Sequence, residues 1–376
     1  MKFDTMLRLG RVSNLPTVWT NAVAGATLAG GAEAGVLALA ALSLSLSYVG
    51  GMWLNDAFDA DIDARERKDR PIPTGAATVG QAFAGGFAML AAGVALAFLI
   101  SPGAGLTGLA LAAAIVLYDW LHKRTALSPV IMGAARFLAY GVGAMAAGGF
   151  TETALWGAAG LFAYVVGLTY AAKQEAYDRL GAAWPLAALA FPLALALHAG
   201  WSATAALPLA LALAALLAWA LRLLFRRARG DVPRAVVTMI AGIALYDGAL
   251  AASVGAPALA AFAVACFALT LLLQRVAPGT KPDDSDQSNT WLSVSRLKSR
   301  ASTAPSPSSP GAEEITSGPS AGSSVSRPCV PFTSWASWSE ITSSRRRKPS
   351  LRKPSRQPAD SLGLLSAGSK NSSTGS

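Results

Sequence analysis

Long apolar segments recur along the first three quarters of the chain, and short polar or Gly- and Pro-containing stretches separate them. Each segment has roughly the 17–25 residues with which an α-helix crosses the hydrocarbon core of a bilayer. Ala, Gly and Leu dominate the segments, and such small side chains allow close helix–helix contact in lipid. We expect segments at 15–32, 35–54, 79–100, 104–121, 128–149, 153–172, 183–199, 203–224, 235–253 and 257–274. The pattern predicts an all-α fold, a polytopic transmembrane helical bundle of nine to ten spans.

Glycine pairs inside or beside these segments predict where helices touch. The pieces are Gly85-Gly86, Gly141-x-Gly143 and Gly148-Gly149. A glycine can mark a close contact between helices, because it lets two backbones approach. It can equally mark a flexible point or the end of a helix, and the sequence leaves both interpretations open.

Connections that contain Lys or Arg alternate with connections that contain none. The basic residues lie at 8–11, 65–70, 123–124, 173–179 and 222–229. Loops rich in Lys and Arg stay on the cytoplasmic side of a membrane. We therefore expect an integral membrane protein of the bacterial inner membrane, with every basic connection in the cytoplasm. Ten spans would return the chain to that side at Arg275.

The most highly charged connection is the stretch 55–75, which reads NDAFDADIDARERKDRPIPTG. If the preceding helix continues, Asp56, Asp59 and Asp63 share one of its faces, with Asn55 on the neighbouring edge. Carboxylates at this spacing repel one another unless cations lie between them. Mg2+ suits such a site, because it binds one or two carboxylates together with phosphate oxygens.

Basic residues follow the aspartates directly, and they would give phosphate oxygens a second set of partners. Pro71, Pro73 and Gly75 then end the helix in an exposed turn. Asp61 lies off the shared face and is expected either to support the metal ligands from outside or to cap the loop. The alternative interpretation is a solvated loop of mixed charge, but the regular acidic spacing at a helix end favours a binding site.

The pattern NDxxDxxxD, followed by RPIPTG, resembles the first aspartate-rich motif of the UbiA superfamily of intramembrane prenyltransferases. Arg11, Asn14, Pro16, Thr17, Trp19 and Asn21 resemble the N-terminal signature of this family, and residues 118–136 resemble its central region. The resemblance covers roughly residues 8–275. It implies Mg2+-dependent transfer of a prenyl group from an isoprenoid diphosphate to an aromatic or other lipophilic acceptor within the membrane. Members of the family usually have nine helices.

The second aspartate-rich motif of the family, DxxxD, has no intact counterpart here. The corresponding stretch, 170–179, reads YAAKQEAYDR, in which Glu175 and Asp178 are three residues apart. Lys173 lies where its charge could replace part of that of a cation. This variant resembles the EboC-like branch of the superfamily, and it leaves the second metal less certain than the first.

The resemblance and the charge pattern together predict the role of each site residue. The metal ligands would be Asp56, Asp59 and Asp63, with Glu175 and Asp178 in support. Charge on the departing diphosphate would be neutralised by Arg65, Arg70, Lys123 and Lys173. The remaining substrate-binding residues would be Asn21, Asn55, Arg136 and Tyr170. Asn21 and Arg136 lie within apolar segments and should therefore face the interior of the bundle. Arg136 is either such a ligand or one half of a structural salt bridge, with Asp119 as its partner.

The apolar pattern stops near residue 276, and Ser, Pro, Lys and Arg dominate residues 277–376. Such a composition buries too little apolar surface to offset chain entropy, so the sequence predicts a disordered tail. An out-of-frame extension of a GC-rich gene would give the same abrupt change. We therefore divide the chain into a UbiA-like transmembrane domain, 1–276, and a low-complexity segment, 277–376.

Composition excludes several other classes of protein. Of the net charge of +10, the apolar part carries +4 and the tail +6, so the charge does not indicate a nucleic-acid partner. Two cysteines and two histidines are too few for a disulfide framework or a Cys/His metal site. The expected partners are a prenyl diphosphate, a lipophilic acceptor and membrane lipids.

Two other functions remain as alternatives. A membrane transporter or carrier would also place charged residues inside a bundle, although no inverted repeat is evident. A CDP-alcohol phosphotransferase would also be acidic and Mg2+-dependent, but its DGxxAR string is missing from the sequence. The sequence does not specify the acceptor, the donor chain length or the oligomeric state.

Overall fold

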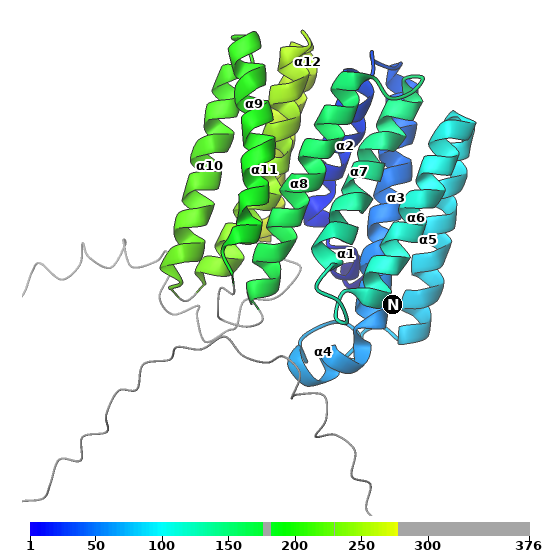
Figure 1. The fold of residues 1–376 in the computed structure, drawn as a ribbon. Helices are drawn as coiled ribbons and strands as arrows, with labels where there is room; N and C mark the ends of the chain where they lie inside the picture. The colour runs from blue at the N-terminus through cyan, green and yellow to red at the C-terminus, as the bar shows by residue number, and fades with distance from the viewer. Residues whose placement is uncertain (176–181, 229, 277–376) are drawn as a thin grey trace, which may run out of the picture. The chain divides into compact units, whose positions relative to one another are not determined.

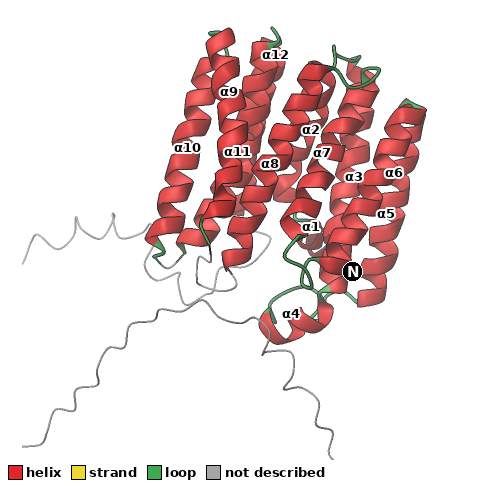
Figure 2. Cartoon of the chain, in the orientation of Figure 1, coloured by secondary structure: helices red, strands yellow, loops and turns green. Residues whose placement is uncertain are grey.

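The computed structural model describes residues 1–175, 182–228 and 230–276, and within these ranges every regular element is helical (Figure 1, Figure 2). The elements are α1 (Phe3–Gly10), η1 (Val12–Asn14), α2 (Leu15–Leu28), α3 (Ala34–Phe58), α4 (Ala60–Glu66), α5 (Val79–Ile100), α6 (Pro102–Leu121), α7 (Ser128–Ala146), α8 (Glu152–Glu175), η2 (Trp184–Leu189), α9 (Ala190–Ser202), α10 (Leu207–Arg226), α11 (Asp231–Ser253) and α12 (Pro257–Val276). The predicted all-α bundle is confirmed. The tail, 277–376, lies outside the described residues.

Nine helical segments in the described part of the chain are long and apolar enough to cross a membrane. They correspond to the second through tenth predicted segments. The first predicted segment is helical only over the 14 residues of α2, because Gly30 and Gly31 have positive φ angles and form a turn after it. The prediction of nine to ten spans is confirmed, and the protein is an integral membrane protein.

Local sequence explains where several of these helices begin. The Thr78 side chain accepts from the backbone N–H of Gln81, and the Gln81 side chain accepts from the backbone N–H of Thr78, which forms a capping box at the start of α5. Ser101 caps α6 in a similar way, and Pro102 occupies the first turn, where its missing N–H costs nothing.

The helix predicted to run through the acidic stretch is instead broken at Asp59. Asn55 and Asp56 lie in the last turn of α3, Asp59 lies at the break, and Asp63 lies on the short helix α4. The aspartates therefore do not share one face of a continuous helix. Figure 1 shows α4 at the end of the bundle, turned away from the direction of α3.

Close contact between α2 and α7 is possible because both helices carry glycine where they meet. A Cβ on Gly25 would lie 2.3 Å from the carbonyl oxygen of Tyr140, and one on Gly143 would lie 2.3 Å from that of Ala22. The contact predicted for Gly85-Gly86 is also present, between α3 and α5. The contact predicted for Gly148-Gly149 is wrong, because both residues have positive φ angles, have open space around them and form the turn after α7.

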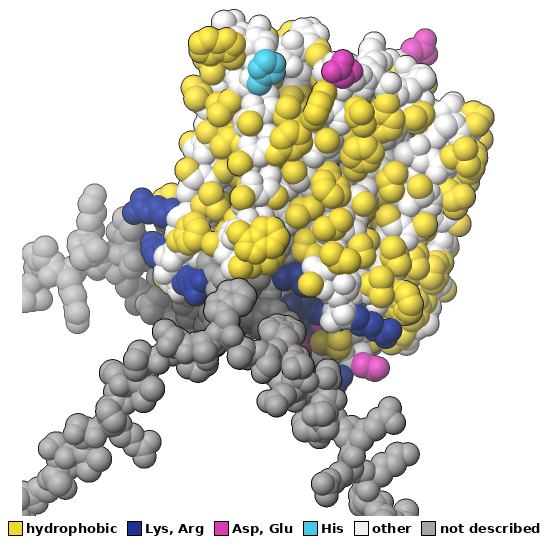
Figure 3. All heavy atoms as spheres, viewed as in Figure 1, with side chains coloured by type: hydrophobic (Ala, Val, Ile, Leu, Met, Phe, Trp, Pro, Cys, Tyr) yellow, Lys and Arg dark blue, Asp and Glu magenta, His cyan; other side chains and the backbone are white. Residues whose placement is uncertain are grey.

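The outer surface of the bundle exposes many apolar side chains, as expected of a protein that contacts lipid. Large apolar side chains such as Leu99, Leu106 and Leu211 are exposed. On the face shown in Figure 3, Lys and Arg side chains gather near the end of the bundle at which α4 lies. The basic connections predicted to share one side of the membrane thus include a group of basic side chains near the end of the bundle at which α4 lies.

Replacing Gly25 with Ala should destabilise the protein, because the new Cβ would overlap backbone that cannot move aside. We expect the free energy of unfolding to fall by roughly 1–3 kcal/mol. Gly35→Ala is a matched control, since nothing lies within 4 Å of its Cβ position. Unfolding of the purified proteins in detergent micelles measures the difference. Equal stability of the two variants would contradict the close contact between α2 and α7.

Candidate active site

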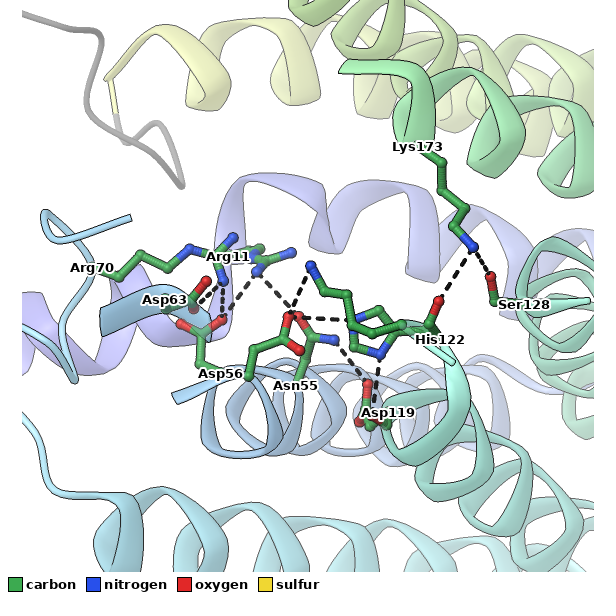
Figure 4. A network of polar contacts seen from close by, with 11 residues as sticks. Arg11, Asn55, Asp56, Asp63, Arg70, Asp119, His122, Ser128 and Lys173 are labelled. Carbon is green, nitrogen blue, oxygen red and sulfur yellow. Dashed lines mark hydrogen bonds and ion pairs between the residues drawn. The ribbon is translucent and has the colours of Figure 1, made fainter. Parts of the chain in front are cut away.

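Three buried aspartates gather where α3 meets α4 (Figure 4). Asp56, Asp59 and Asp63 expose only 4, 3 and 1% of their surfaces. Burying a carboxylate without a partner is costly, so each needs a compensating charge or hydrogen bond.

Arg70 bridges two of these carboxylates. Its Nη1 lies 2.9 Å from Asp56 Oδ1 and 2.9 Å from Asp63 Oδ2. The turn that follows Arg70 is fixed locally, because the Thr74 hydroxyl donates to the Arg70 carbonyl oxygen at 3.0 Å. Arg11 adds a second guanidinium, with Nη2 lying 3.0 Å from Asp56 Oδ1. The chain's own arginines thus lie where a bound cation would otherwise balance the charge.

Asp59 has a different set of cationic partners. Its Oδ2 lies 3.2 Å from His122 Nε2 and 3.6 Å from Lys123 Nζ. His122 Nδ1 lies 3.1 Å from the backbone oxygen of Asp119. His122 thus lies between an oxygen of Asp59 and the backbone oxygen of Asp119, and it links the end of α3 to α6.

These contacts shift the pKa values at the end of the bundle in different directions. Burial alone would raise the pKa of Asp59, but the His122 hydrogen bond and nearby positive charges outweigh it and lower the pKa. Burial prevails at Asp63 and raises its pKa, although Arg70 opposes the shift. Burial, reinforced by the charge of Arg11, lowers the pKa of Arg70.

Asn55 links the ionic cluster to the interior of the bundle. Its Oδ1 accepts from Arg11 Nη2 at 3.4 Å, and its Nδ2 donates to Asp119 Oδ1 at 3.1 Å. Asp119 is itself buried, with 4% of its surface exposed. The contacts therefore pass from charged groups at the helix ends to a carboxylate inside α6 (Figure 4).

A cavity of about 80 Å³ lies beside Asp119, among α2, α3, α6 and α7. Most of its wall is apolar, with Val18, Leu44, Leu111 and Ile115 among the lining side chains. Asp119 and Arg136 are the charged residues of the wall. An ionic cluster thus adjoins an apolar cavity, an arrangement that suits a ligand with one charged end and one hydrocarbon end.

Arg136 has a partner that the sequence did not predict. Its Nη1 donates to Asn21 Oδ1 at 2.7 Å, and its guanidinium lies 5.8 Å from the centre of the Tyr48 ring. Of the two alternatives left open for Arg136, the salt bridge with Asp119 is not observed, since none of the ion pairs between described residues joins the two.

Asp247, on α11, completes this second network. Asn21 Nδ2 donates to its Oδ2 at 2.8 Å, and the Tyr140 hydroxyl donates to its Oδ1 at 3.0 Å. The position of Asn21 inside the bundle, predicted from its depth in an apolar segment, is confirmed. The sequence analysis missed Asp247, although a single Asp within an apolar span is itself a signal of function or of a specific partner.

The other predicted residues lie in several places. Lys173 Nζ donates to the Ser128 hydroxyl at 2.5 Å and to the backbone oxygens of His122 and Thr125 at 3.2 Å, which joins α8 to the connection between α6 and α7. Arg65 is exposed and bonds to the backbone of its own helix, outside the cluster. The Tyr170 hydroxyl donates to the Ala182 carbonyl oxygen. The Glu175 side chain and Asp178 lie outside the described residues.

The described residues contain no group of three His, Cys, Asp or Glu side chains already arranged to hold a metal ion. The donor chemistry nevertheless fits Mg2+, which prefers carboxylate oxygens. Asp63 Oδ1 is buried and has no hydrogen-bond partner, so one oxygen of the cluster is available to a ligand. A metal would have to share or displace the Arg70 contacts.

Comparison with known proteins identifies the family of the chain. The family model described as the UbiA prenyltransferase family matches residues 15–240, more than half of the chain. The chain therefore belongs to the UbiA prenyltransferase family, as its sequence predicts.

Individual relatives match over shorter stretches. The chain is 37% identical over 111 residues to a protoheme IX farnesyltransferase from Korarchaeum cryptofilum, which covers 28% of this chain and 38% of that protein. It is 34% identical over 125 residues to a digeranylgeranylglyceryl phosphate synthase from Thermococcus gammatolerans, covering 33% of this chain and 45% of that protein. The chain thus spans less than half the length of these curated relatives.

A solved structure supports the fold independently. The apo structure of a UbiA homologue from Aeropyrum pernix K1 superposes with a TM-score of 0.51 and 20% identity, over 63% of this chain and 96% of that chain. At this identity the likeness concerns the fold alone.

Arg70→Gln should destabilise the protein, because it leaves two buried carboxylates without their shared partner. We expect the free energy of unfolding to fall by about 3–5 kcal/mol, as when one member of a buried ion pair is removed. Arg65→Gln is the matched control: its side chain is exposed, and its effect should stay within about 0.5 kcal/mol. Unfolding in detergent measures both. If the two variants lost equal stability, Arg70 would not be the central partner of the aspartates.

Proposed function

We propose that the protein transfers a prenyl group from an isoprenoid diphosphate to a lipophilic acceptor within the membrane, in a reaction that requires Mg2+. The observation that carries the proposal is the contact between the ionic cluster and the apolar cavity, through Asn55 and Asp119. A prenyl diphosphate has the same division into a charged end and a hydrocarbon end.

The diphosphate would bind at the ionic cluster. Arg11, Arg70 and Lys123 bring hydrogen-bond donors to this place. A guanidinium group binds phosphate oxygens with the same geometry with which it binds carboxylate oxygens. Since Arg70 is already bonded to Asp56 and Asp63, it would exchange carboxylate oxygens for diphosphate oxygens when the donor binds. Lys173 supports the site indirectly, by holding the backbone that carries His122 and Lys123.

Asp56, Asp59 and Asp63 would hold Mg2+, with the free Oδ1 of Asp63 as the first oxygen available. When bound, the ion supplies Lewis-acid stabilisation of the charge that develops on the leaving diphosphate. The described residues do not include the side chains of Glu175 and Asp178, so a second ion remains a proposal from the sequence alone.

The hydrocarbon chain of the donor would lie against the apolar wall of the cavity, among α2, α3, α6 and α7. Burial of such a chain contributes roughly 0.8 kcal/mol for each CH2 group removed from water. The activity is assigned to residues 1–276, in a bacterial inner membrane, with the ionic cluster on the cytoplasmic side because the basic connections share that side.

Asp59→Asn should weaken Mg2+-dependent binding of a prenyl diphosphate. One charge-assisted contact contributes roughly 1.5–3 kcal/mol, so we expect a loss of about tenfold or more in affinity. Asp61→Asn is the control, because Asp61 is exposed and lies outside the ion pairs of the cluster. Labelled geranyl, farnesyl and geranylgeranyl diphosphates, each with Mg2+ or with EDTA, provide the measurement. Wild-type protein that binds none of the three donors in either condition would refute the proposed function.

A further inference from the structure

Three buried side-chain atoms in the described residues have no hydrogen-bond partner: Trp53 Nε1, Asp63 Oδ1 and Asp119 Oδ2. Only Asp119 lines the apolar cavity. An unpaired carboxylate oxygen in a buried setting costs free energy, so its presence calls for a ligand that pairs with it. The proposed roles of Asp56, Asp59 and Asp63 make no use of this oxygen.

Asp119 lies at the junction between the two parts of the site. Its Oδ1 accepts from Asn55, which also contacts Arg11 in the ionic cluster, while the cavity extends along α6 and α7 on the other side. If the diphosphate binds at the cluster and its hydrocarbon chain in the cavity, the carbon that joins them lies near this junction. The acceptor must reach that carbon, and so must pass close to Asp119.

We propose that Asp119 is a further catalytic residue, whose Oδ2 accepts a hydrogen bond from a hydroxyl group of the acceptor and takes its proton. The inference rests on the proposed function and deepens it, because it limits the acceptor to an alcohol or a phenol. The acceptor oxygen forms a bond to C1 of the prenyl group as the bond from C1 to the diphosphate oxygen breaks. The diphosphate leaves with the bonding electron pair, the proton moves to Asp119 Oδ2, and nothing is oxidised or reduced.

The other polar groups of the cavity wall are less suited to this step. Arg136 has donors only. The Tyr48 hydroxyl donates to the Arg11 carbonyl oxygen and accepts from Asn14, and the Ser47 hydroxyl donates to the Ser43 carbonyl oxygen. The Tyr118 hydroxyl also lines the cavity, but a neutral phenol takes up a proton far less readily than a carboxylate. Asp119 is the one carboxylate in the cavity wall, and among the described lining residues its Oδ2 is the buried side-chain oxygen that has no hydrogen-bond partner.

If Asp119 had only a structural role, that role would involve Oδ1 and not Oδ2. Holding Asn55 in place requires only Oδ1, which accepts from Asn55 Nδ2. Asp119→Asn keeps this acceptor, because the amide oxygen can take the same hydrogen bond. The variant changes only the free position, where it places an N–H2 group that cannot accept a proton. The two roles therefore predict different results for one substitution.

The experiment uses the purified full chain in detergent, with labelled geranylgeranyl diphosphate and Mg2+. Two hydroxyl probes, 1-decanol and 4-hexylphenol, are compared with their methyl ethers, and transfer is measured as label in an ether product identified by mass spectrometry. Donor binding is measured separately. Asp231→Asn is the matched control, since Asp231 is also fully buried but pairs with Arg226 away from the cavity.

We expect wild-type protein to prenylate at least one hydroxyl probe and neither methyl ether. Asp119→Asn should bind the donor within about twofold of wild type, while kcat for transfer falls by roughly 10²–10⁴-fold, the usual contribution of a general base. Asp231→Asn should keep wild-type transfer.

Three results would overturn the inference: wild-type kcat in Asp119→Asn, equal transfer to a methyl ether, or donor binding with no transfer to either hydroxyl probe. Failure of the proposed function looks different, because wild-type protein would then not bind the donor at all.

Discussion

The double ion pair of Arg70 with Asp56 and Asp63 is the interaction on which the rest of the site depends. All three side chains are buried, and the burial of both carboxylates is tolerable because each of them pairs with the Arg70 guanidinium. Asp56 lies at the end of α3, Asp63 on α4 and Arg70 in the turn that follows. The two ion pairs therefore join the end of α3 to α4 and to the turn that follows. Arg11 connects the N-terminal segment to the same place.

The same interaction gives the site its chemistry. A guanidinium that pairs with carboxylates can also pair with a diphosphate, so ligand binding would be an exchange of partners within the cluster. Free aspartates would instead repel one another in the absence of a ligand. The cavity next to Asp119 is lined mostly by apolar side chains, and it suits a hydrocarbon chain. The region that would bind the diphosphate and the cavity that would bind the hydrocarbon chain are thus connected by the hydrogen bond between Asn55 and Asp119.

Much of this arrangement could be predicted from the sequence. The period and length of the apolar segments predict the helices, and the spacing of Asp56, Asp59 and Asp63 predicts an acidic cluster at a helix end. The break at Asp59 was not predicted, because the spacing of the aspartates is equally compatible with one continuous helix, whereas the structure brings Asp56 and Asp63 to Arg70 from the two sides of the break. The pairing of His122 with Asp59 was missed for a similar reason: the two residues are 63 positions apart, and only the packing of α3 against α6 joins them. Asp247 could have been found from its apolar surroundings alone.

The central claim is that the ionic cluster binds the diphosphate together with a metal, and that Arg70 exchanges its partners in doing so. Crystals of the protein grown with Mn2+ and geranyl S-thiolodiphosphate, a donor that resists cleavage, test it directly through the anomalous signal of manganese. The account predicts a manganese peak bound by oxygens of Asp56, Asp59 or Asp63, with Arg70 in contact with the diphosphate. A manganese peak and diphosphate bound elsewhere, with the Arg70 ion pairs unchanged, would contradict it.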